Sequence, residues 1–176
     1  MSFLHEHQGY AAFCFRVSST TFGYSSPAPQ TAYISRLYIS VVTLGEMEYG
    51  HQANPSADPG KQAAFESFVR TSCPVSWPIT ADVARHYGQL RAWLLDTCGP
   101  RGSRTKVKRA EQLVNPVTGV ELGIQENDLW IAAQALTHNF ALVTHDHRGN
   151  FGKLLNQFAA GLNVEDWAEG QEMRER

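Results

Sequence analysis

The sequence predicts an α/β fold: a three-layer α/β/α sandwich whose central sheet is mostly parallel. One observation and one general rule support this prediction. Short apolar runs rich in β-branched residues alternate along the chain with longer amphipathic segments. Neighbouring parallel strands also need a crossover connection, which a helix normally supplies. With 176 residues, 43% of them hydrophobic, the chain is long enough for one domain with a buried core.

The first half of this domain begins with a strand at residues 38–42 (YISVV), followed by a short helix that ends in the turn-forming residues 53–60. A second helix is expected at 61–71, and a short strand within 74–79. The segment 81–98 predicts a long helix, because Val83, Tyr87, Leu90 and Leu94 share one face at helical spacing.

The second half follows a segment without sustained apolar periodicity, residues 99–123, which predicts a long loop. After it we expect a helix opening near residue 127, in which Leu129, Ala132, Ala133 and Leu136 form a buried face. The remaining elements are a strand at 141–144, a short helix near 151–158 and a closing strand at 162–167. Residues 1–37 form an atypical, partly flexible N-terminal segment, and residues 169–176 form a C-terminal tail.

The composition narrows the class of protein. No apolar run approaches the length of a membrane span. Cys14, Cys73 and Cys98 are odd in number and widely spaced, which disfavours a disulfide framework or structural zinc site and favours a cytoplasmic location. A net charge of −2 argues against indiscriminate coating of nucleic acid, although a local basic patch is compatible with it.

Such a patch lies in the predicted loop. It consists of five cationic side chains within nine positions, namely Arg101, Arg104, Lys106, Lys108 and Arg109. One interpretation is contact with the phosphates of an RNA backbone. The other is a solvated loop that only keeps the protein soluble, and the sequence leaves both open.

Candidate metal ligands lie at strand ends and at one helix start. Asn127 is expected to cap the helix, which would place Asp128 at the positive end of the helix dipole, where a carboxylate stays ionised. Glu46 and Asp146 follow the strands at 38–42 and 141–144, and sites in such sheets lie at the carboxyl ends of strands. Three neighbouring carboxylates persist only around a divalent cation, and hard oxygen ligands favour Mg²⁺ or Mn²⁺, which can activate water.

Each acid also has an ordinary structural explanation. Acids are common in the first turn of any helix, so Asp128 alone is weak evidence. Thr43-x-x-Glu46 matches a capping box, in which the glutamate serves only the backbone. Asp146 fits a turn after a strand, and its neighbours His145 and His147 leave open a softer transition-metal site.

Four segments together resemble one family: ISVVTLGEMEYG (39–50), NDLWIAAQAL (127–136), ALVTHD (141–146) and LNVEDW (162–167). They resemble a PIN domain of the VapC toxin type over residues 38–168. The resemblance implies a four-acid, Mg²⁺-dependent endoribonuclease that forms a homodimer and is inhibited by a cognate antitoxin. By position, Glu46 would be the second acid, Asp128 the third and Asp146 the fourth. The polar residues Thr43, Asn127 and Thr144 would lie beside these ligands and support them.

The first acid of the family pattern is missing. In the family it ends an apolar N-terminal strand, whereas this chain has no Asp or Glu between Glu6 and Glu46. Residues 10–18 are compatible with a strand, but no acid ends it, and Glu6 is expected to be a tail residue. Residues 18–31 resemble a Ser/Thr/Pro-rich linker.

Two explanations for this departure remain. The chain is a degenerate member of the family, or a frameshift or misassigned start has replaced the family sequence in residues 1–37. Translation of the upstream DNA in three frames distinguishes them. The sequence therefore predicts a weakened endoribonuclease toxin, with a non-catalytic module that binds RNA or antitoxin as the alternative.

Overall fold

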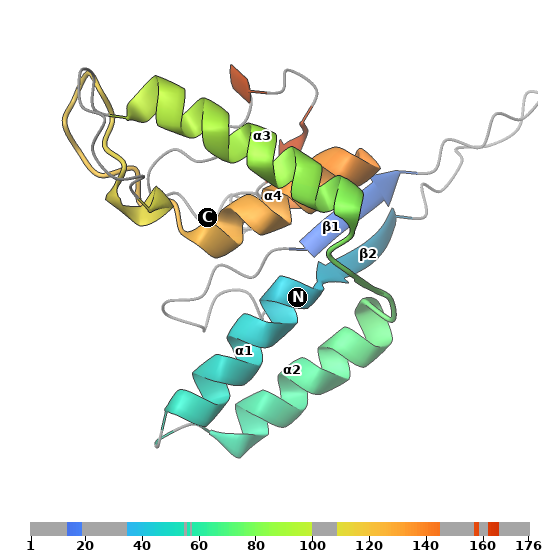
Figure 1. Cartoon of the computed structure of the whole chain (residues 1–176). Coiled ribbons are helices and arrows are strands. Elements are labelled where there is room, and N and C mark those ends of the chain that lie inside the picture. Colours follow the sequence, from blue (N-terminus) through green and yellow to red (C-terminus); the bar gives the residue numbers. More distant parts are fainter. Residues whose placement is uncertain are drawn as a thin grey trace, which may run out of the picture.

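The computed structural model describes residues 14–18, 35–54, 56, 58–99, 109–144, 157–158 and 162–165, with 14–18 and 35 as backbone only. Five strands form one sheet in the order β3–β2–β1–β4–β5 (Figure 1). The strands are β1 (Cys14–Ser18), β2 (Ser35–Ser40), β3 (Ser76–Trp77), β4 (Ala141–Val143) and β5 (Val164–Glu165). The helices are α1 (Val41–Ala53), α2 (Pro59–Ser72), α3 (Ala81–Cys98), the short 3₁₀ helix η2 (Ala110–Gln112) and α4 (Glu126–His138).

Four of the five strands share one direction. β2 pairs with β3 in parallel, and β4 pairs with β5 in parallel. β1 lies between the two pairs and runs antiparallel to both β2 and β4. Since β1 opposes both neighbours, β2 and β4 must point the same way. The predicted mostly parallel sheet is confirmed, with its central strand as the exception.

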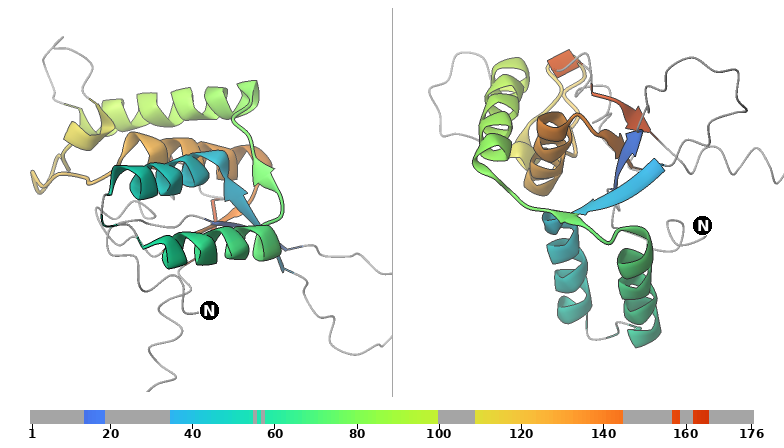
Figure 2. Two further views of the ribbon diagram at one scale, coloured as in Figure 1. Left: turned by 90° about the horizontal axis from the view of Figure 1, so that it is seen from below. Right: turned by 90° about the vertical axis from the view of Figure 1, so that its right-hand side faces the viewer.

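The helices cover both faces of the sheet, which confirms the predicted three layers (Figure 2). Consecutive residues of a strand point to opposite faces, so Tyr38 and Leu142 join the core under α3 and α4, while Ile39 and Val143 face α1 and α2. The core under α3 and α4 is the larger one. On the other face, only Ile39, Cys73 and Val143 of the described residues form a fully buried cluster.

The long helix α3 has the bounds that its periodicity predicts. The Oγ1 atom of Thr80 caps it by accepting the N–H of Val83 at 3.3 Å. Val83, Leu90 and Leu94 are at most 1% exposed, and Tyr87 is half-buried. The predicted stripe is therefore the face that packs on α4. No helix in the described part of the chain combines the length and apolar character that crossing a membrane would require.

Two elements differ from their predictions in ways that affect the site and its surroundings. The strand expected at 38–42 ends at Ser40, because the Oγ atom of Ser40 accepts the N–H of Val42 at 3.0 Å and starts α1 at Val41. The expected loop 99–123 is ordered over 109–123, with η2, a β-bridge between Val114 and Glu121, and Leu113 and Leu122 in the core. Isolated apolar residues anchor this segment without periodicity, which explains why sequence reasoning missed its order.

Other sequence expectations are described only in part. Residues 157–158 belong to the helix expected at 151–158, and β5 falls within the closing strand expected at 162–167. The linker 18–31, Glu6 and the tail 169–176 lie outside the described residues, except for the backbone of Ser18.

Candidate functional site

Glu46 contacts the residue that directly precedes Asp128 in the chain. Glu46 lies in the second turn of α1, and Asn127 and Asp128 lie in the first turn of α4. The Nδ2 atom of Asn127 donates a hydrogen bond to Oε1 of Glu46 at 2.9 Å, although the two residues are 81 positions apart in the chain. The hydrogen bond brings Asn127, the predicted supporting residue next to Asp128, into contact with Glu46 where α1 and α4 approach each other.

Asp128 has a structural role in its own helix. It is 7% exposed, and its Oδ2 atom accepts the backbone N–H of Gln125 at 2.7 Å. The helix starts at Glu126 with Gln125 as its N-cap, so the expectation that Asn127 caps the helix is wrong. Asn127 is instead the second helical residue, and its side chain is directed toward α1. Asp128 lies in the first turn of the helix, as the sequence predicts.

Glu46, by contrast, caps no helix. The N-cap of α1 is Ser40, which makes Thr43 the third residue of the helix rather than its cap. The capping box suggested by Thr43-x-x-Glu46 is therefore not formed. Thr43 lies on the buried face of α1 and is 2% exposed. A capping role is thus excluded for Glu46, whereas Asp128 does have a capping role in α4.

Thr144 directly follows β4, and its backbone N–H donates to the carbonyl of Glu165 at 3.0 Å. The third predicted ligand, Asp146, lies outside the described residues, as do His145 and His147. The same holds for Arg101, Arg104, Lys106 and Lys108 of the basic patch. Its last member, Arg109, is described and exposed, directly before η2.

Sequence reasoning missed an acid at this edge of the sheet. Glu165 ends β5 in register with Val143 and accepts a hydrogen bond from Nδ2 of Asn163 at 2.9 Å. The rule that directed attention to acids after the strands at 38–42 and 141–144 applies equally to the closing strand. Applied to the segment NVEDW, it would have included Glu165.

The donor atoms of Glu46 and Asp128 are carboxylate oxygens, which suit Mg²⁺ or Mn²⁺ better than softer metals. Over the ranges that the structure describes, no three Asp, Glu, His or Cys side chains cluster closely enough to hold a metal ion. Glu46 and Asp128 are the two candidate ligands in the described part of the site. Two carboxylates are compatible with Mg²⁺, because this ion usually keeps several water ligands.

The direction of β1 bears on the missing first acid. Cys14, at the start of β1, is in register with Ile39 and Val143, close to the carboxyl ends of β2 and β4. Ser18, at the end of β1, is in register with Ser35 at the opposite edge. The carboxyl end of β1 therefore lies at the opposite end of the strands from the start of α1, which carries Glu46. No acid ends β1.

A comparison against protein families places this fold in a known family. The model of the PIN domain matches residues 26–154, well over half of the chain. The chain belongs to the PIN domain family. The match starts earlier than the predicted resemblance, which began at residue 38, and ends before the closing strand.

One solved structure supports the same fold, and a second aligns more weakly. VapBC-1 from nontypeable Haemophilus influenzae aligns with a TM-score of 0.51 and 24% identity, over 79% of this chain and 80% of that one. VapBC2 from Rickettsia felis, in a structure with a DNA fragment from its promoter, aligns with a TM-score of 0.49 and 23% identity, over 74% of each chain. A search of curated protein sequences finds no significant match.

Proposed function

We propose that this PIN domain is a VapC-type endoribonuclease toxin that acts in the cytoplasm, depends on Mg²⁺ or Mn²⁺, and is weakened by the loss of its first acid. The observation that carries the proposal is the link from Asp128 through Asn127 to Glu46. This link supports the proposal, because Glu46 of α1 contacts the residue that precedes Asp128 in α4, and both acids match the family pattern by position.

Glu46 and Asp128 would hold the cation, with Asp146 as the expected third ligand. A cation bound there would lower the pKa of a coordinated water and neutralise the negative charge of the phosphodiester. The amide of Asn127 fixes one oxygen of Glu46, so the carboxylate does not need to be ordered when a cation binds. Without the first acid, the attacking water is held less accurately, and a small misplacement costs on the order of 10²-fold in rate.

RNA binding would rely on the basic patch. Arg109 is exposed beside the ordered segment 109–123, and the four remaining cations precede it within eight positions. Contacts to phosphates release counterions, so binding through this patch should weaken steeply as salt is added. The patch positions RNA but carries little sequence information of its own.

A groove between α1 and α2 offers a place for the cognate antitoxin. It has a volume of about 370 Å³ and an apolar floor that includes Leu44, Met47, Phe65 and Val69. Glu48, Glu66 and Arg70 add charges around this floor. An amphipathic antitoxin helix fits a groove of this kind, because apolar residues at helical spacing would cover the floor and polar ones would face the rim. We also propose a homodimer, which sedimentation of the purified protein would test.

The second candidate is a non-catalytic module that binds RNA or antitoxin. It is favoured by the missing first acid and by the capping role of Asp128, which accounts for that carboxylate without any metal. This candidate predicts RNA binding that is sensitive to salt and unaffected by a chelator.

A cleavage assay on structured RNA separates the two candidates. The wild-type protein, Asp128→Asn and Asp128→Ala are compared with Mg²⁺, with Mn²⁺ and with EDTA. The enzyme proposal predicts slow cleavage that requires the cation and is lost in both variants. Cleavage that persists in EDTA or in Asp128→Asn would come from a contaminant. If the wild-type protein does not cleave RNA at all, the binding module remains as the function.

A further inference from the structure

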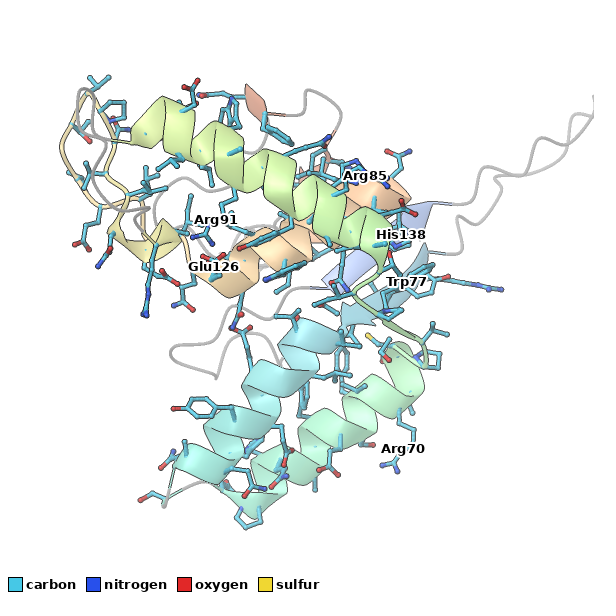
Figure 3. All side chains as sticks on the ribbon, in the orientation of Figure 1. Arg70, Trp77, Arg85, Arg91, Glu126 and His138 are labelled. Carbon is cyan, nitrogen blue, oxygen red and sulfur yellow. The ribbon has the colours of Figure 1, made fainter. Side chains whose placement is uncertain are left out.

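A polar cluster joins α3 to the first turn of α4. The Nη1 atom of Arg91 forms an ion pair with Oε1 of Glu126, and the hydroxyl of Tyr87 donates a hydrogen bond to the same oxygen. Arg91 also donates to the Tyr87 hydroxyl at 2.7 Å. Figure 3 shows Arg91 and Glu126 facing each other between the two helices. The carboxylate of Glu126 is therefore directed toward α3.

The surroundings of this cluster restrict its movement. The ring of Tyr87 stacks on Trp130 of α4, with centroids 3.8 Å apart and planes within 4°. The side chains of Arg91 and Glu126 are each 30% exposed, whereas those of the Arg85–Asp82 pair, within α3 itself, are 66% and 65% exposed. Partial burial weakens screening, so the Arg91–Glu126 pair contributes more than an exposed pair of the same charges.

The residues after Glu126 form the candidate metal site. Asn127 donates to Glu46 on α1, and Asp128 accepts the N–H of Gln125. The N–H of Glu126 donates to Oε1 of Glu111, which lies in η2, at 3.0 Å. Three consecutive side chains of one helical turn thus contact α3, α1 and the cap of α4. A rotation of this turn would move all three together.

We propose that Arg91 is a positioning residue for the metal site, acting through Glu126. It fixes the first turn of α4, which carries Asn127 and Asp128, and it keeps the carboxylate of Glu126 directed toward α3. Without Arg91, Glu126 loses its ion pair and becomes a third uncompensated negative charge within two residues of Asp128, which disturbs the geometry of the two ligands. This inference rests on the proposed metal site.

The test is the affinity for Mn²⁺, measured by electron paramagnetic resonance on folded protein. Arg91→Met should weaken Mn²⁺ binding, by at most the roughly 10- to 100-fold that follows the loss of a direct partner of a metal ligand, because Arg91 acts one residue further away. Arg91→Lys keeps a cation and should recover most of the affinity. The matched control Arg85→Met removes the exposed arginine of α3 and should leave the affinity unchanged.

Thermal unfolding of the same variants separates positioning from stability. A purely structural role would lower the melting temperature of Arg91→Met without changing its Mn²⁺ affinity at a temperature where it is folded, and that result overturns the inference. If Arg91→Met does not fold, Glu126→Gln takes its place. Because it removes the charge of Glu126 and its strong pairing with Arg91, it should also weaken Mn²⁺ binding, and an unchanged affinity again overturns the inference.

A wild-type protein that binds no Mn²⁺ would refute the proposed metal site. The positioning role is then decided by amide hydrogen exchange at residues 125–128. Arg91→Met should speed exchange there by about tenfold or more, since a hydrogen bond to a charged group is lost. The Arg85→Met control should exchange like the wild type. Equal rates in Arg91→Met and the wild type would show that Arg91 does not hold this turn.

Discussion

Two substitutions of Asp128 separate its structural role from its proposed metal-binding role. In the wild type, Oδ2 of Asp128 accepts the N–H of Gln125 at 2.7 Å. Asp128→Asn keeps a carbonyl oxygen that can accept this N–H but removes the negative charge. Asp128→Ala removes both the acceptor and the charge. The first variant should therefore keep the cap and lose the cation, and the second should lose both.

The expected sizes follow from these contacts. Loss of a side-chain cap destabilises a helix by about 1 kcal/mol, and in a chain of this length 1 kcal/mol shifts the melting temperature by about 2–4 °C. Asp128→Ala should melt lower than the wild type by about this amount in EDTA, while Asp128→Asn should stay closer to the wild type. At a free cation concentration ten times the dissociation constant, binding should stabilise the wild type by about 1.4 kcal/mol.

The assay is thermal unfolding followed by circular dichroism, in EDTA and in Mn²⁺ at matched ionic strength. Mn²⁺ should raise the melting temperature of the wild type and of neither variant. Glu46→Gln should also lose the response to Mn²⁺ while melting near the wild type in EDTA, because Glu46 caps no helix. An equal rise in Asp128→Asn and the wild type would refute the assignment of Asp128 as a metal ligand.

Three further outcomes test the structure away from the site. Burial lowers the pKa of His138, against the opposing charge of Asp82, so between the folded and unfolded pKa values the native state binds fewer protons. Stability, measured by urea unfolding, should therefore fall as the pH drops below about 6.5, and should fall less in His138→Phe; identical pH profiles would contradict this. Leu129→Ala, at a fully buried position, should cost about 3 kcal/mol in the same assay, and a cost near zero would mean that α4 is not packed as described. Cys73 and Cys98 are buried, and burial raises the pKa of the Cys98 thiol, so both should react with a thiol reagent far more slowly than in unfolded protein; rapid labelling of the native protein at either cysteine would argue against their burial.

Local patterns predicted the helices better than the contacts between them. The spacing of Val83, Leu90 and Leu94 specifies both a helix and its buried face, and α3 has the expected bounds. The acids Glu46 and Asp128 were found because strand ends and helix starts are visible in the sequence. The hydrogen bond between Asn127 and Glu46 was not predictable, because no local pattern encodes a contact across 81 residues.

Strand direction lies outside the reach of such patterns as well. An alternating or apolar run such as residues 10–18 looks the same whether the strand runs parallel or antiparallel to its neighbours. The direction depends on which partners are available and on the connection between strands. For β1 the connection to β2 comprises residues 19–34, long enough for either arrangement by its length alone.

The reversed direction of β1 has a consequence for any attempt to restore a full set of ligands. An aspartate introduced at Ser18 would imitate the family motif in sequence, yet it would lie about 13 Å along the strand from the level of Cys14, at the wrong edge of the sheet. Repair therefore requires exchanging the whole strand for one that runs parallel to β2 and ends in an acid. The first acid of the family pattern therefore cannot be restored by one substitution in β1, because the direction of the strand would also have to change.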